Sequence, residues 1–259
     1  MAILIIAVTL AAILLVSICL ILLRLRAILD PGRSKQRRRR GKGRTHLLIV
    51  LGSGGHSAEM IAMLERAVRE EDARRKLEWE DYSCRTWIVG SGDDISARRA
   101  KEFEEMVAGL QKVNGNANGK VRKAEDTKWR IVTVPRAREI HQPMLTAPVS
   151  CLRCLVACWN ILLPTEGPRD IDRPDLIICN GPATATILVL TSVLLRFFNV
   201  RGCNSEGKMR TVYIESWARV KRLSLSGWLM VRVVDRFFVQ WQQLLESTGG
   251  RGEYLGVLV

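Results

Sequence analysis

An unbroken uncharged run from Ala2 to Leu23 opens the chain and constrains its folding more than any other feature. As a helix, these 22 residues span about 33 Å at about 1.5 Å each, which matches the roughly 30 Å hydrocarbon core of a bilayer. A cleaved signal peptide has a shorter apolar region with its basic residues in front. Here the basic residues follow the run, so we predict a retained single-pass transmembrane helix over 2–23.

A basic segment over 24–44 follows this run directly. It contains ten Lys and Arg residues against one acid, Asp30, and holds +9 of the formal net charge of +14. By the positive-inside rule, this segment keeps the rest of the protein in the cytosol. The body itself is near +5, so its charge does not indicate a nucleic-acid partner. We predict a juxtamembrane linker here, which serves as a topology signal and can also contact anionic headgroups.

Strand-like and helix-like patterns alternate through the body, 45–259. Strands are predicted at His46–Leu51, Thr86–Val89, Arg130–Val134, Asp175–Cys179, Thr211–Glu215 and Arg236–Trp241. Helices are predicted at Ser57–Arg69, Ser96–Val107, Val149–Leu163, Ala183–Phe198 and Leu225–Val234. The alternation predicts an α/β fold, a single Rossmann-like domain with a mostly parallel sheet covered on both faces. The sequence NGNANG at Asn114–Gly119 predicts a turn-rich insertion.

Cysteines are seven in number, and this odd count suggests no disulfide framework and a reducing environment. Cys151, Cys154 and Cys158 have a spacing that resembles a metal site. They lie on an apolar helical pattern without a neighbouring histidine or a fourth ligand, so we predict buried thiols and no metal.

A glycine loop, Gly52-Ser53-Gly54-Gly55, joins the first predicted strand to the first helix and ends at His56. Free N–H groups at a helix N-terminus favour an anion such as a phosphate. The loop lacks the third glycine of the dinucleotide fingerprint and the Gly-Lys-Ser/Thr of a triphosphatase loop. His56 is a candidate for phosphate contact or proton transfer; a tight turn with a structural histidine is the alternative.

Two further segments follow strands and should lie at the same sheet edge. Asn180 and Gly181 form a second candidate ligand loop, with a simple strand–helix turn as the alternative. Glu215 is a candidate for binding sugar hydroxyls, with an ion pair to Arg219 as the alternative. The apolar C-terminal tail predicts a docking strand or plug for a partner, over the residues Tyr254, Leu255, Gly256, Val257, Leu258 and Val259.

Several sequence blocks together resemble one family. They are LGSGGHSAEM (Leu51–Met60), CNGPATA (Cys179–Ala185), YIESWARV (Tyr213–Val220), FVQW (Phe238–Trp241) and YLGVLV (Tyr254–Val259). In this order, and behind an N-terminal anchor, they are similar to the asparagine-linked glycosylation protein fourteen family.

The resemblance implies the membrane subunit of a transferase that adds the second N-acetylglucosamine to dolichol-diphosphate-N-acetylglucosamine, with the UDP-sugar as donor. It implies the N-terminal half of a GT-B glycosyltransferase, inactive without a soluble donor-binding partner, the asparagine-linked glycosylation protein thirteen. It also implies the cytosolic face of the endoplasmic reticulum, with the contiguous nuclear membrane, and no cofactor. The alternatives from the residues are a self-sufficient membrane-bound nucleotide-sugar or NAD-dependent enzyme, or a scaffold without ligand contact.

In this family's bacterial relative, a Gly-Gly-His loop faces the acceptor diphosphate, and it matches Gly54, Gly55 and His56 here. The relative's strand-end glutamate matches Glu215. The family's extreme C-terminus docks the partner, which corresponds here to Glu253–Val259.

Overall fold

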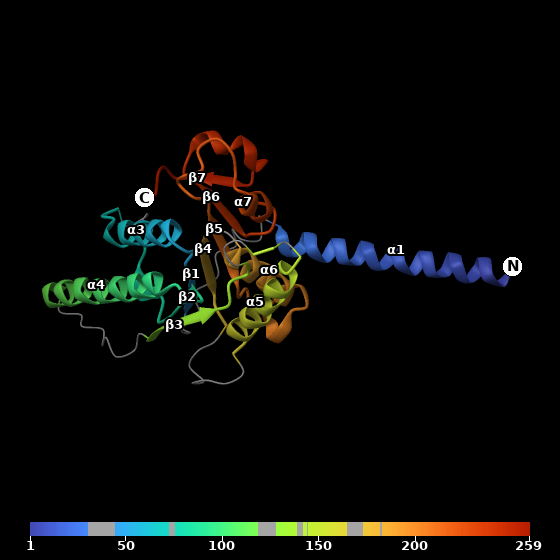
Figure 1. Ribbon diagram of the computed structural model, residues 1–259, viewed down its shortest axis with the longest axis horizontal. Helices are drawn as coiled ribbons and strands as arrows, with labels where there is room; N and C mark the ends of the chain where they lie inside the picture. Colours follow the sequence, from blue (N-terminus) through green and yellow to red (C-terminus); the bar gives the residue numbers. More distant parts are fainter. Residues whose placement is uncertain are drawn as a thin grey trace.

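Seven parallel strands form the central sheet in a computed structural model of the chain (Figure 1). The structure describes residues 1–30, 45–72, 76–118, 128–138, 142–143, 145–164, 173–181 and 183–259, without the side chains of 111–118. The predicted linker beyond residue 30, and also Gly119, His141 and Pro182, lie outside the described residues.

The sheet has the strand order β3-β2-β1-β4-β5-β6-β7, and all six neighbouring pairs are parallel. The strands are β1 (His46–Val50), β2 (Cys84–Gly90), β3 (Lys128–Val134), β4 (Leu176–Asn180), β5 (Arg210–Ile214), β6 (Arg236–Val239) and β7 (Gly252–Tyr254). The first six confirm the predicted strands within two residues at each end, while β7 was not predicted.

Helices cover both faces of this sheet, as predicted for an α/β fold. They are α1 (Ala2–Leu29), α3 (Gly55–Arg69), α4 (Asp94–Asn118), α5 (Ala147–Leu162), α6 (Thr184–Phe197) and α7 (Leu225–Met230). Short 3₁₀ turns are η1 (Trp79–Asp81), η3 (Val200–Gly202), η4 (Gln242–Leu244) and η5 (Glu246–Thr248). Figure 1 shows α3 and α4 on one face, and α5 and α6 on the other.

Strand β1 shows how the sequence fixes this layering. Leu47 and Ile49 pack into the apolar cluster of α3 and α4, whereas Leu48 and Val50 pack into the cluster of α5 and α6. Every residue of β1 is buried. A strand covered on both faces needs such a continuous apolar run instead of an alternating one.

Helix α1 is long and apolar enough to cross a membrane, by length and composition. It continues to Leu29, six residues past the predicted end at Leu23, because the body of the protein satisfies its last carbonyl groups. Arg196 donates to the Ile28 carbonyl at 3.1 Å and Arg251 to the Leu29 carbonyl at 2.8 Å. The start of the predicted linker is therefore helix that is fixed to the domain.

Helix α4 also corrects a prediction. It extends through Asn118, so most of the predicted turn-rich insertion at Asn114–Gly119 is helical. One glycine costs a helix about 1 kcal/mol relative to alanine. Each added residue also gains a backbone hydrogen bond once the helix has started, so such a penalty does not by itself end the helix.

The cysteines of α5 lie as the apolar pattern predicted. Cys154 and Cys158 are fully buried with their Sγ atoms 4.0 Å apart, and Cys151 is half-buried. Burial raises the pKa of the Cys179 thiol on β4 to about 12. These thiols therefore contribute to the core.

Candidate functional site

The carboxyl ends of β1 and β4 lie side by side, since Val50 pairs with Cys179. From this point β1 leads into α3 on one face of the sheet, and β4 leads into α6 on the other face (Figure 1). Ligands of open α/β sheets bind at such a switch point. Helices α3 and α6 both begin here, and the N-cap residue of each makes no capping hydrogen bond with its side chain. Their N–H groups give this edge a partial positive charge.

The two predicted loops meet around His56. A Cβ atom on Gly52 would lie 2.7 Å from His56 Cβ, and one on Gly181 would lie 3.0 Å from His56 Cγ. Gly181 and Gly54 also have positive φ angles of 96° and 64°. Gly52 is therefore required by the lack of space, Gly54 by its backbone conformation, and Gly181 by both. The prediction that the loops after β1 and β4 share one sheet edge is confirmed by this contact.

Residue Ala183, the N-cap of α6, adopts φ 49° and ψ −79°, which is strained for a residue with a side chain. Such strain gathers at ligand sites, where surrounding contacts maintain it. Directly before this turn, the side chain of Asn180 is fully buried. Its Oδ1 and Nδ2 have no hydrogen-bond partner among the described residues. The Asn180 side chain also contributes to the lowered pKa of Glu59, so it lies close to that carboxylate. A buried amide whose hydrogen bonds are not all made is costly, which makes Asn180 a candidate contact for a ligand.

Glu59 lies one helical turn after His56 on α3, and it was not among the site residues predicted from the sequence. His56 Nδ1 is 3.7 Å from Glu59 Oε2, and the His56 side chain remains 32% exposed. The same Nδ1 is buried and lacks a hydrogen-bond partner among the described residues. A spacing of three residues places both side chains on one helix face, so the sequence did contain a signal for this pair.

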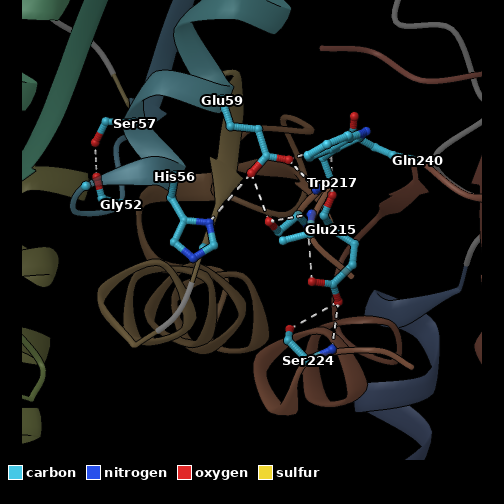
Figure 2. Close-up of polar contacts among 12 residues, drawn as sticks. Gly52, His56, Ser57, Glu59, Glu215, Trp217, Ser224 and Gln240 are labelled. Carbon is cyan, nitrogen blue, oxygen red and sulfur yellow. Dashed lines mark hydrogen bonds and ion pairs between the residues drawn. The ribbon is translucent and has the colours of Figure 1, made fainter. Parts of the chain in front are cut away.

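Three groups from the strand ends hold the Glu59 carboxylate (Figure 2). Ser216 Oγ donates to Oε2 at 2.9 Å, while the Trp217 N–H and Gln240 Nε2, the latter at 2.6 Å, donate to Oε1. Burial acts to raise the pKa of this carboxyl, but His56 and these donors outweigh burial. The pKa of Glu59 therefore lies below its usual range, and the group is held as an anion beside His56.

Glu215 lies at the same edge but is only 1% exposed. Its carboxylate accepts from the Ser216 N–H at 3.1 Å, and from the Ser224 N–H and Oγ at 3.2 and 3.1 Å. Ser224 in turn caps α7 by accepting from the Gly227 N–H. Burial raises the pKa of Glu215. This geometry fixes the start of α7 and keeps the carboxylate buried within the domain, and binding of sugar hydroxyls by Glu215 stays a prediction. Glu59, not Glu215, is the carboxylate that faces His56.

The C-terminal tail is packed more closely than the sequence suggested. β7 pairs with β6, Arg66 donates to the Val257 carbonyl at 3.0 Å, and the Leu258 N–H donates to Gln240 Oε1 at 3.2 Å. Leu258 packs against the cluster of α3 and α4. An apolar side chain of the tail nevertheless faces solvent: Leu255 is 63% exposed.

Fold and site together define a class of protein: a Rossmann-like domain with a candidate ligand site at its switch point, joined to an N-terminal apolar helix of membrane-spanning length. Within this class, the chain belongs to the family described as oligosaccharide biosynthesis protein Alg14 like, whose model matches residues 47–258. The family resemblance drawn from the sequence is thereby confirmed.

Similar proteins bear related names. The chain is 39% identical to the UDP-N-acetylglucosamine transferase subunit alg14 of Aspergillus fumigatus, over 72% of this chain and 97% of that protein. It is 36% identical to the subunit ALG14 of Cryptococcus neoformans, over 88% and 87%. Among solved structures, MurG of Acinetobacter baumannii is similar with a TM-score of 0.42 and 12% identity. That match covers 76% of this chain but only 41% of MurG.

Proposed function

We propose that this chain is the membrane-anchoring, acceptor-side subunit of a UDP-N-acetylglucosamine transferase. It adds the second N-acetylglucosamine to dolichol-diphosphate-N-acetylglucosamine at the cytosolic face of the endoplasmic reticulum. A soluble donor-binding subunit, the asparagine-linked glycosylation protein thirteen, docks on its C-terminal tail. The family assignment and the names of its relatives support the transferase role.

The observation that carries the acceptor role is the position of His56 between two uncapped helix N-termini. A diphosphate is an anion, and N–H groups at a helix N-terminus are suited to bind it. The backbone of Gly52–Gly55 and the loop at Asn180–Gly181 are the groups we assign to it. Both loops are short and lie at the sheet edge, so they form one wall of a cleft. The donor-binding subunit supplies the opposite wall.

His56 then acts on the acceptor in one of two ways. In transfer, the acceptor hydroxyl loses its proton as its oxygen bonds to the donor sugar and UDP departs. A neutral imidazole can take that proton, and an imidazolium can instead hold the diphosphate. Glu59 at 3.7 Å orients the ring in both cases. A His56→Lys variant separates them, because lysine keeps a cation for phosphate but is a poor proton acceptor at neutral pH.

Anchoring places this wall at the membrane. Helix α1 is joined to the domain by the bonds of Arg196 and Arg251 to its last carbonyls. A lipid-linked acceptor is confined to the bilayer, so a tethered site meets it at a raised effective concentration. The basic residues after the helix favour a cytosolic body.

A transferase assay tests the proposal directly. It uses UDP-N-acetylglucosamine and a lipid-diphosphate-N-acetylglucosamine acceptor with this chain alone, the soluble subunit alone, and both together. We expect turnover only from the pair. Full turnover by this chain alone would contradict a shared cleft. Deleting Leu255–Val259 should release the soluble subunit from membranes, and undiminished co-purification would contradict docking on the tail.

A further inference from the structure

The side chain of Gln240 joins three separate parts of the domain. It follows β6 and is fully buried. Its Nε2 donates to Glu59 Oε1 at 2.6 Å and to the Glu215 carbonyl at 3.1 Å. Its Oε1 accepts from the Leu258 N–H at 3.2 Å. Both donor hydrogens and the acceptor of this one amide are therefore used inside the protein.

These bonds connect the C-terminal tail to the site. Glu59 is at once a partner of Gln240 and the carboxylate 3.7 Å from His56. The path from the Leu258 N–H to the imidazole therefore runs through two hydrogen bonds and the 3.7 Å contact between Glu59 and His56. Figure 2 shows the inner part of the path, with Gln240 and His56 on opposite sides of the Glu59 carboxylate.

An uncharged amide suits this position. A carboxylate at residue 240 would place a second negative charge against Glu59 and could not donate. An apolar side chain would leave the Leu258 N–H and one Glu59 oxygen with fewer partners in a buried place, which is costly. Only a group that donates on one side and accepts on the other satisfies both neighbours.

The tail has an inner and an outer side. Its Leu258 side chain and N–H point into the domain, while Tyr254, Leu255 and Val259 are 39%, 63% and 44% exposed. A partner can therefore cover the outer side without breaking the bond to Gln240. Covering the tail would favour the ordered arrangement in which this bond is made, and a ligand shifts an equilibrium by its preference for one state.

We propose that Gln240 is a positioning residue that couples the C-terminal tail to the Glu59–His56 pair, so that docking of the donor-binding subunit orients His56. The inference rests on the proposed function in one respect, which is that the tail is the docking segment. It goes beyond docking because it links the two halves of the cleft: a docked donor side stabilises the arrangement of the acceptor side that the free chain already forms.

The first experiment needs only the full chain in lipid nanodiscs. Imidazole ¹⁵N chemical shifts of His56 are measured in wild type, Gln240→Met, Leu258→Pro and the double variant. Leu258→Pro removes the N–H that donates to Gln240, and Leu258→Met is its control because it keeps that N–H. Gln243→Met is the matched surface control, since Gln243 is exposed. The signal of His46, which bonds Thr86, serves as an internal reference for folding.

We expect Gln240→Met and Leu258→Pro to shift the His56 signals, and the controls to leave them unchanged. In the double variant, Leu258→Pro should add nothing to Gln240→Met, because the path is already broken. Unmoved His56 signals in either single variant, or shifts that simply add, would overturn the coupling. Leu258→Pro keeps the test valid even where Gln240→Met folds poorly.

The second experiment adds the donor-binding subunit. In wild type its binding should shift His56 further, and in Gln240→Met it should bind within about twofold of wild type without that shift. We expect turnover of the Gln240→Met pair to fall about tenfold, within the usual range of coupling between sites. Normal turnover with normal binding would refute the proposal. Loss of binding on tail deletion tests the docking function separately, since the first experiment involves no partner.

Discussion

Glu59 and Glu215 lie at the same edge of one sheet, yet the structure gives them opposite surroundings. The Glu59 carboxylate accepts hydrogen bonds from the two loops after β5 and β6 and faces the partly exposed ring of His56, with its pKa below the usual range. The Glu215 carboxylate is closed in by its own loop and by the start of α7, and burial raises its pKa. The difference lies in which neighbours donate to each group.

The comparison teaches that a place after a strand is not enough to identify a site residue. Parallel strands bring many side chains to one edge. A residue at that edge either contacts a ligand or holds the loops that do. Glu215 does the second for α7, and Glu59 lies between His56 and the strand ends. Predictions that separate these two roles test this distinction.

The largest effect is expected at His56, the partly exposed residue beside Glu59. His56→Ala should lower turnover of the two-subunit enzyme on the order of 10³-fold, within the usual range for a general acid or base. Steady-state kinetics with saturating UDP-sugar measure this effect. Binding of the soluble subunit should persist, and this serves as the folding control. Turnover within a few-fold of wild type would remove His56 from the site.

A smaller loss is expected at Glu59. In Glu59→Gln, the amide oxygen can keep the bonds from Trp217 and Gln240, while the charge beside His56 disappears. Loss of the carboxylate behind a catalytic histidine removes its orientation, so we expect a fall on the order of 10²-fold in turnover. Glu105→Gln on α4 is the control, because that side chain is exposed. Equal turnover in both variants would place Glu59 outside the site.

Around the buried Glu215 the expected effect is on the stability of the fold. In Gly227→Ala, the new Cβ would lie 1.8 Å from Glu215 Oε2, so the carboxylate and its bonds to Ser224 must move. We expect a loss of about 2 kcal/mol in the free energy of unfolding, as for other overpacked sites. Gly109→Ala on α4 is the matched control, since its added Cβ meets no described atom within 4 Å apart from its chain neighbours and the backbone of its own helix. Similar thermal midpoints for both variants would contradict a structural role for Glu215.

The sequence was most informative where one pattern decided the outcome. Near-continuous apolar runs predicted β1 to β6, and the place of the Gly52–Gly55 and Asn180–Gly181 loops directly after parallel strands predicted that they share one edge. The three-residue strand β7 has no such pattern, because Gly252 and Glu253 are poor β-formers. It forms through pairing with β6, where Arg236 and Glu253 also form an ion pair at 2.6 Å. Contacts between distant segments of this kind leave no local signal.

The same limit applied to the site. Glu59 lay within helical reach of His56, but this spacing alone did not show whether its carboxylate faces the strand ends or solvent. Its role depends on Ser216, Trp217 and Gln240, which are more than 150 residues away in the sequence. Glu215 drew the prediction instead, because it directly follows a predicted strand.

The smallest effect is expected for Glu215→Gln. The direction in which its stability relative to wild type changes with pH distinguishes the two carboxyl groups most directly. A raised pKa in the folded state means that folding favours the protonated form of Glu215. That contribution is fully present below the unfolded pKa of about 4.3 and is lost as pH rises through the folded pKa. Glutamine does not ionise. The stability of Glu215→Gln relative to wild type should therefore increase as pH rises above about 4.3.

Glu59→Gln should show the opposite trend. The lowered pKa of Glu59 stabilises the folded state above the unfolded pKa, and this contribution is lost as pH falls through the folded pKa. Thermal midpoints of both variants and wild type, measured from about pH 3 to about pH 8, on both sides of the unfolded carboxyl pKa of about 4.3, give the two slopes.

Turnover of Glu215→Gln should stay within about threefold of wild type. Losing one of its accepted hydrogen bonds costs only about 1 kcal/mol, and this loss affects the start of α7. Parallel slopes for the two variants would mean that both carboxyl groups share one environment, and the distinction between a site residue and a loop anchor would fail.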